Sequence, residues 1–177
     1  MARDHARIAV RIWSDPDFIA LKPDAQLAYL MLVSNPDLSW CGVADYVPAR
    51  FVKLSDGMTP RRFEAAVDVL RARRFVLTDD RTAEVLVRSY VRHDGLLKQP
   101  NVAKAMVRAV ARTHSATLRD AVVDELVRAK GDDPAAKGWV GVESEDPELY
   151  AHICLAANLN PSGNPSSNPS GKGSRNG

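Results

Sequence analysis

The chain has 177 residues, of which 45% are hydrophobic and 26% are charged, close to the average for soluble proteins. This composition excludes a wholly disordered chain and a collagen-like fibre. No apolar run approaches the roughly 18 residues that a membrane span needs, so no membrane association is expected. Two cysteines, Cys41 and Cys154, lie far apart and outside any CxxC motif. We therefore expect reduced thiols and a cytoplasmic protein.

The net charge of +2 is unevenly distributed along the chain. Residues 50–112 contain fourteen Lys and Arg against seven acids, a balance of +7, whereas residues 1–49 and 113–160 have balances of −2 and −5. A basic segment between two acidic ones indicates an anionic partner for the middle segment. A solvated, charged surface explains the same pattern equally well.

Up to residue 57, helix caps and prolines predict a series of short helices. Asp15 or Ser14 can cap a turn over residues 16–21, and Pro23 suits the first turn of a helix over 23–34. A further short helix is predicted near 47–54.

Thr59 followed by Pro60 is a strong helix start, because the hydroxyl can cap the helix and proline fits its first position. We predict a helix over 60–73 that buries one face. The residues of that face follow the i, i+3, i+4, i+7 spacing: Phe63, Ala66, Val67 and Leu70.

Two β-rich runs, 75–78 and 84–91, flank a polar turn at 79–82 and predict a β-hairpin. Helices are then expected over 102–112, with Asn101 as the cap, over 116–130 and over 147–158. The last residues repeat Asn-Pro-Ser and contain no large apolar side chain, so a flexible tail is predicted.

This order of elements predicts a mainly α fold with a small β-hairpin, arranged as a winged helix-turn-helix. We expect three segments: a winged-helix DNA-binding domain over 1–112, an acidic helical segment over 113–159, and a disordered Asn/Pro/Ser/Gly tail over 160–177.

The helix over 60–73 is the candidate recognition helix. Its outward face combines arginine with small alanines, and Asp68 is the one acidic exception. Arg61 and Arg62 lie in the first turn, where cations oppose the helix dipole by about 0.3–1 kcal/mol, so stability alone does not favour them. Further candidates lie at the tip of the hairpin (Arg81), on its second strand (Arg88) and in a basic stripe spaced by four residues on the helix over 102–112. The predicted DNA contacts are Arg50, Lys53, Thr59, Arg61, Arg62, Arg73, Arg81, Arg88, Lys104, Arg108 and Arg112.

Two of these groups have plain structural explanations. Arg88, Tyr90 and Arg92 alternate on one face of the predicted second strand and could bind a single strand, but a solvated strand face with Tyr90 half-buried is favoured. A solvated surface also explains the stripe of Lys104, Arg108 and Arg112 as well as phosphate binding does.

The sequence contains no GxxxxGK[ST], no strand-linked GxGxxG, no HExxH and no GxSxG. Its four histidines are scattered. We therefore expect no enzyme activity, no cofactor and no metal site.

Residues 12–18 (IWSDPDF), 21–30 (LKPDAQLAYL), 87–95 (VRSYVRHDG) and 98–102 (KQPNV) resemble the winged-helix proteins of actinobacterial phages. These are helix-turn-helix or replication-initiation proteins, similar to the N-terminal domain of phage replisome organisers. The resemblance covers residues 8–112 and does not extend to 113–177. It implies a protein that binds a replication origin and recruits the replication machinery in the cytoplasm of a bacterial host cell.

Three hypotheses follow. The first is a phage or prophage replication-initiation protein that binds DNA, with duplex favoured over single strands, and that binds a replication protein or another copy of itself through residues 113–159. The second is a transcriptional repressor on the same fold, which would need a dimer to span two half-sites. The third is a protein–protein adaptor without DNA binding, for which Asp68 and the modest total charge are the support.

Overall fold

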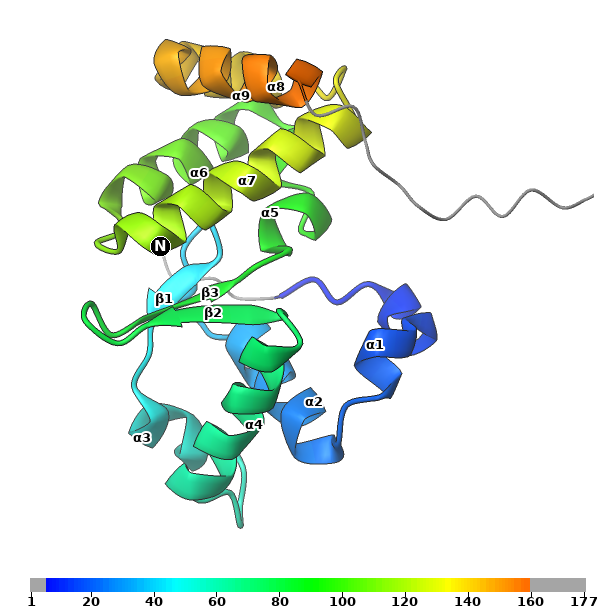
Figure 1. The fold of residues 1–177 in the computed structure, drawn as a ribbon, viewed down its shortest axis with the longest axis vertical. Coiled ribbons are helices and arrows are strands. Elements are labelled where there is room, and N and C mark those ends of the chain that lie inside the picture. Colours follow the sequence, from blue (N-terminus) through cyan, green and yellow to red (C-terminus); the bar gives the residue numbers. More distant parts are fainter. Residues whose placement is uncertain (1–5, 160–177) are drawn as a thin grey trace, which may run out of the picture.

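The computed structural model describes residues 6–159, so the predicted tail over 160–177 lies outside the described residues. The described chain is mainly helical and contains a three-stranded antiparallel sheet. The sheet lies in the middle of the molecule, with one group of helices on each side (Figure 1). The predicted mainly α fold with a small hairpin is confirmed at this level.

The first group of helices precedes the hairpin in the chain. Asp15 caps the first α-helix by accepting hydrogen bonds from the backbone N–H groups of Asp17 (2.9 Å) and Phe18 (3.4 Å), as predicted. Four of these helices begin at a proline, whose fixed φ suits the first helical position. The elements are η1 (Val10–Ser14), α1 (Pro16–Ile19), α2 (Pro23–Val33), α3 (Pro48–Phe51), η2 (Val52–Leu54) and α4 (Pro60–Ala72).

Helix α4 forms as its sequence predicts. Oγ1 of Thr59 accepts a hydrogen bond of 3.3 Å from the backbone N–H of Arg62. The helix packs against α2 and α3, and the rings of Phe63 and Phe51 stack at 5.0 Å between centroids. All four residues of the predicted core face are buried: Phe63, Ala66, Val67 and Leu70.

The sheet has the order β1-β3-β2, from β1 (Val43–Asp45), β2 (Val76–Asp79) and β3 (Glu84–Val87). The β2–β3 hairpin is the predicted one. Strand β1 was not predicted, because three residues carry too little pattern and the strand forms by pairing with β3.

The second strand was predicted to reach residue 91, and this is wrong. Strand β3 ends at Val87 and the short helix α5 (Tyr90–His93) follows, so Arg88, Tyr90 and Arg92 do not alternate along a strand. Tyr90 is buried against Gly42, where an added Cβ would lie only 2.7 Å from the Tyr90 Cβ. Gly42 also has a φ of 85°, which favours glycine.

The second group of helices lies on the other side of the sheet (Figure 1). Within this group, α6 packs on α8, and α7 packs on α9. Helix α8 was not predicted, and α6 joins the helices that follow it in the chain, across the predicted segment boundary at Arg112. The elements are η3 (Leu96–Lys98), α6 (Pro100–Arg112), α7 (Ala116–Asp132), α8 (Trp139–Glu145) and α9 (Pro147–Leu159). None of the helices formed by residues 6–159 is both long enough and apolar enough to span a membrane.

Candidate nucleic-acid interface

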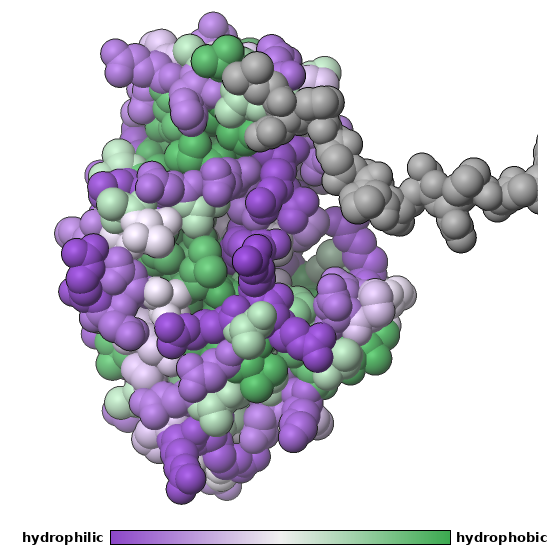
Figure 2. All heavy atoms as spheres, viewed as in Figure 1, coloured by the Kyte–Doolittle hydropathy of each residue, from purple (hydrophilic) through white to green (hydrophobic). Residues whose placement is uncertain are grey.

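The structure brings five of the predicted contact residues together where α3 and η2 precede α4. This part of the molecule lies below the sheet in Figure 1, and Figure 2 shows a largely hydrophilic surface over it. All five side chains are exposed: Arg50, Lys53, Thr59, Arg61 and Arg62.

Within this group, Arg62 is already bound by the protein. Its Nη2 lies 2.7 Å from Oδ1 of Asp24 and its Nε lies 3.1 Å from Oδ2, while Nη1 donates to the carbonyl of Gly57 at 2.8 Å. The hydrogen bonds that Arg62 donates to Asp24, and then the charge of Asp24, raise the pKa of Arg62. The side chain therefore braces α4 against the start of α2, and most of its donors are unavailable to a ligand.

Arg61 and Lys53 are different. Both are exposed, and neither forms an ion pair or side-chain hydrogen bond with any residue in the described part of the chain. Arg50 is only weakly paired, since its Nη1 lies 3.4 Å from Oδ2 of Asp45 and both side chains are exposed. Lys53 on η2 and Arg61 at the start of α4 are therefore free to bind an anion.

The middle of α4 is acidic. Glu64 and Asp68 are exposed on this helix and lie near Tyr46, just after β1. Burial, followed by these two carboxylates, raises the pKa of Tyr46 to about 12. Arg71 offsets this charge in part through a surface pair of 3.5 Å with Asp68. The exposed face of α4, on which Asp68 was predicted to be the one acid, therefore has two carboxylates, Glu64 and Asp68.

The end of α4 is basic again. Arg73 occupies the C-cap position and Arg74 follows it with a φ of 59°, an uncommon conformation for arginine. Both are exposed, and no ion pair within residues 6–159 involves them. Arg74 was not predicted as a contact, although the run Arg-Ala-Arg-Arg at 71–74 was visible in the sequence.

Arg81 lies at the hairpin tip, where its side chain is 80% exposed and 3.7 Å from Oδ2 of Asp79. Asp79 in turn accepts a hydrogen bond of 2.7 Å from Oγ of Ser115 and one of 3.0 Å from the backbone N–H of Arg81. These hydrogen bonds lower the pKa of Asp79. The tip is therefore anchored to the start of α7 and holds Arg81 outward.

Arg88 does not belong to this surface. Its Nε lies 3.2 Å from Oε1 of Glu125, a fully buried carboxylate on α7. Glu125 also forms ion pairs with Arg92 and Arg128. Arg88 is only 28% exposed and is paired inside the protein, so its predicted contact with DNA stays a prediction that the surface around α4 does not support. Glu125 was missed, although it stands within the apolar stripe of α7, seven residues after Leu118.

The basic stripe of α6 is separate from α4, since the sheet lies between the two helices (Figure 1). Arg108 pairs with Glu145 of α8 through bonds of 2.7 and 2.8 Å, which raise the pKa of Arg108 and lower that of Glu145. Arg112 lines a hollow of about 540 Å³ beside β1, together with Trp40. Arg108 therefore ties α6 to α8, and the stripe of Lys104, Arg108 and Arg112 does not extend the surface around α4.

Residues 6–159 contain no cluster of three or more His, Cys, Asp or Glu side chains that could hold a metal ion. No protein-family model, no curated protein and no solved structure matches the chain.

Proposed function

We propose that the chain is a winged-helix DNA-binding protein in which α4 enters the major groove. The observation that supports this most directly is the combination of two features. Helix α4 packs across α2 and α3 and is followed by the β2–β3 hairpin, which is the element order of a winged helix-turn-helix. The start of α4 and the preceding η2 also present Arg61 and Lys53, which have no ionic partner in the described structure.

The two ends of α4 would bind phosphates. Arg61 and Arg73 are twelve residues apart, which corresponds to about 18 Å along the helix axis. That separation exceeds the width of the major groove, roughly 12 Å, so cations at the two ends can contact the backbones that border it. The carboxylates of Glu64 and Asp68 would then face base edges, where a carboxylate can accept a hydrogen bond from cytosine N4.

A role in replication initiation is the more specific part of the proposal. It derives from the resemblance of residues 8–112 to phage replication-initiation proteins. In this role the helices α7–α9, which contain most of the acidic residues of 113–159, would bind a replication protein or a second copy of the chain.

The test is fluorescence anisotropy with the full chain and labelled 20-base duplex or single-stranded DNA of random sequence, at 50 and 200 mM salt. We expect duplex binding that weakens at least about tenfold between the two salt concentrations, because several phosphate contacts release counterions. The double variant Lys53→Gln with Arg61→Gln should lower duplex affinity by at least about tenfold with an unchanged melting temperature.

The matched control is Lys98→Gln with Lys137→Gln, which removes the same charge from exposed positions on η3 and in the loop before α8. It should bind DNA almost as tightly as the unaltered chain. Equal losses in both double variants would indicate a general charge effect and contradict the assignment to α4. No binding to either DNA at 50 mM salt would contradict DNA binding itself.

The acidic middle of α4 favours one alternative, a protein–protein adaptor that uses the same helix. Glu64 and Asp68 would then bind a basic partner directly. In that case the double variant Glu64→Gln with Asp68→Asn would abolish partner binding, whereas on DNA the removal of two negative charges should raise non-specific affinity.

A further inference from the structure

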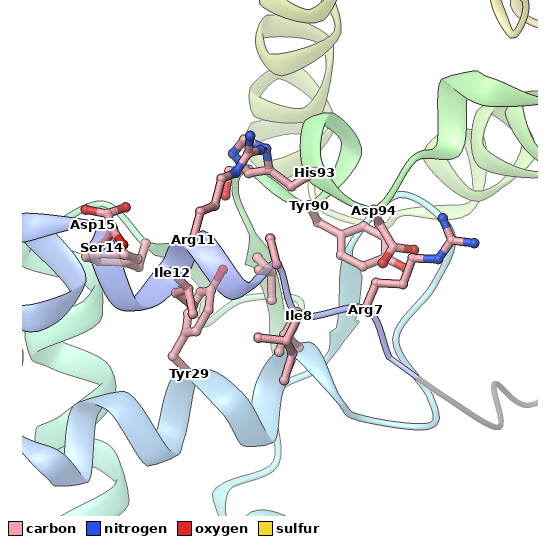
Figure 3. A pocket seen from close by; sticks show the side chains of 15 residues that line it. Arg7, Ile8, Arg11, Ile12, Ser14, Asp15, Tyr29, Tyr90, His93 and Asp94 are labelled. Carbon is pink, nitrogen blue, oxygen red and sulfur yellow. The ribbon is translucent and has the colours of Figure 1, made fainter.

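A cavity of about 450 Å³ lies between the N-terminal segment and the body of the protein, away from the surface around α4. Figure 3 shows residues 7–15 passing along it, with Tyr29 of α2 on one side and Tyr90 and His93 of α5, followed by Asp94, on the other. Its volume is within the range of small-molecule sites, about 300–1,000 Å³. The DNA-binding proposal makes no use of this cavity.

The inner wall is apolar and aromatic. Val33, Phe75 and Val87 line it, and Phe75 belongs to an edge-to-face arrangement of rings in which its centroid lies 5.6 Å from that of Tyr29. Ile8 and Ile12 cover the opposite side, and Ile8 remains 44% exposed. A flat hydrophobic group would gain contacts on both sides here.

Two arginines lie at the mouth of the cavity. Arg7 and Arg11 both line it and are exposed. Nη2 of Arg11 lies 3.0 Å from Nδ1 of His93, which must accept the bond because a guanidinium only donates. Burial, and then the guanidinium groups of Arg92 and Arg11, lower the pKa of His93, so its imidazole is neutral at pH 7. Arg11 retains further donors, and Arg7 forms no ion pair within the described residues.

The two acids that line the cavity are engaged by the protein. Asp15 accepts the backbone N–H groups at the start of α1, at 2.9 and 3.4 Å. Asp94 accepts a hydrogen bond of 2.9 Å from the hydroxyl of Tyr90. Asp15 uses Oδ1 for both of its bonds and Asp94 uses Oδ2, so each carboxylate is held in place through one oxygen. The guanidinium groups of Arg7 and Arg11 are the charged donors at the cavity that can bind an anionic ligand.

We infer that this cavity binds a small molecule with a flat apolar body and one carboxylate. The body lies between Ile12 and the Tyr29–Phe75 wall, and the carboxylate is held by the guanidinium of Arg11, which lies beside His93 at the mouth (Figure 3). The bound molecule would connect the N-terminal segment to α2, which packs against α4. The inference stands independently of DNA binding.

The test uses 2-naphthoate as the probe and 2-naphthalenemethanol, its neutral analogue, in calorimetric titrations of the full chain at low salt. We expect one naphthoate per chain and at least about tenfold weaker binding of the alcohol, because charge-assisted hydrogen bonds are the stronger ones. Arg7→Gln with Arg11→Gln should remove this preference, whereas Lys22→Gln with Lys137→Gln, at exposed positions that do not line the cavity, should retain it.

Two further variants test whether the probe occupies this cavity. Val33→Phe fills it from α2, and Ile12→Trp fills it from the N-terminal segment, so either folded variant should lose binding of both probes by at least about tenfold. Absence of naphthoate binding to the unaltered chain at millimolar concentration would overturn the inference. Unchanged binding in a folded variant with a filled cavity would overturn it as well.

Discussion

Nε of Arg92 on α5 donates a hydrogen bond of 2.7 Å to Oε2 of Glu125 on α7, and the Glu125 side chain is only 1% exposed. Arg88, immediately after β3, reaches the other oxygen of the same carboxylate at 3.2 Å. One buried acid therefore joins the end of the sheet, α5 and α7. This contact connects the part of the chain proposed to bind DNA with the acidic helices that follow it.

Replacing Glu125 by glutamine should destabilise the protein strongly. Arg88 and Arg92 are only about a quarter exposed. Loss of their shared counter-ion would leave Arg88 partly buried without an acidic partner in the described residues, and Arg92 with only Asp132 at 3.8 Å. Breaking such a buried pair costs about 3–5 kcal/mol, and the exposed fraction of the arginines places the expected loss near the lower limit. Urea unfolding followed by circular dichroism measures it.

The matched control is Asp124→Asn, the same change at the neighbouring position of α7, where the side chain is exposed. It should change the free energy of unfolding by less than about 0.5 kcal/mol. A stability of Glu125→Gln equal to that of this control would contradict the role of Glu125 as the connecting acid.

Thr59 offers a way to separate stability from DNA binding. Thr59→Ala removes the cap of α4 and should cost about 1 kcal/mol, because the backbone N–H of Arg62 loses its acceptor. Thr59→Asp preserves a capping oxygen but adds a negative charge next to Arg61. Its melting temperature should stay close to that of the unaltered chain while duplex affinity falls several-fold in the anisotropy assay. Equal affinity in Thr59→Asp would mean that DNA does not approach the start of α4.

Elements held by contacts between residues close in the sequence could be predicted, and elements held by contacts between distant residues could not. Helix α4 could be predicted because its cap, its first proline and its buried face all lie within 14 residues. Strand β1 could not, because its pairing partner β3 is about 40 residues away and nothing local requires an extended conformation.

The same reasoning applies to the candidate interface. The basic composition around α4 was visible in the sequence, but which cations are free was not. Arg62 is bound by Asp24, 38 positions away, and Arg88 is bound by Glu125, 37 positions away. Neighbouring arginines such as Arg61 and Arg62 look equivalent in the sequence and differ only through these distant partners.

A second buried acid makes stability depend on pH. Glu84 accepts the backbone N–H groups of His114 at 3.0 Å and Ser115 at 2.7 Å, between α6 and α7. Burial alone raises the pKa of Glu84, but these hydrogen bonds outweigh burial, and the net pKa lies below its ordinary value. The folded state therefore binds this proton less readily than the unfolded state. The resulting stabilisation is complete above the ordinary pKa of about 4.3 and is lost as pH falls through the lower folded value.

Glu84→Gln should accordingly lower stability at pH 7 by about 1–3 kcal/mol, because an amide can offer only one acceptor oxygen to the two N–H groups. The difference from the unaltered chain should shrink as pH falls below about 4.3, where the stabilisation by the carboxylate is lost. Urea unfolding between pH 7 and pH 3 measures this, with the exposed Glu143→Gln on α8 as the control. A difference that is the same at every pH would contradict ionic stabilisation by Glu84.

The contact between α6 and α8 depends on the absence of a side chain at Gly141. A Cβ at this position would lie 2.1 Å from the carbonyl oxygen of Pro100, which is backbone and cannot move aside. Gly141→Ala should therefore separate the two helices and cost about 1–3 kcal/mol, as overpacking does. Gly131→Ala, on the exposed last turn of α7, is the control and should be neutral or stabilising by up to about 1 kcal/mol. Separation of α6 and α8 would also weaken the ion pair between Arg108 and Glu145 and expose Trp139, which is only 3% exposed in the folded protein. A red shift of tryptophan emission in Gly141→Ala, absent in Gly131→Ala, would confirm the close approach, and equal stabilities of the two variants would contradict it.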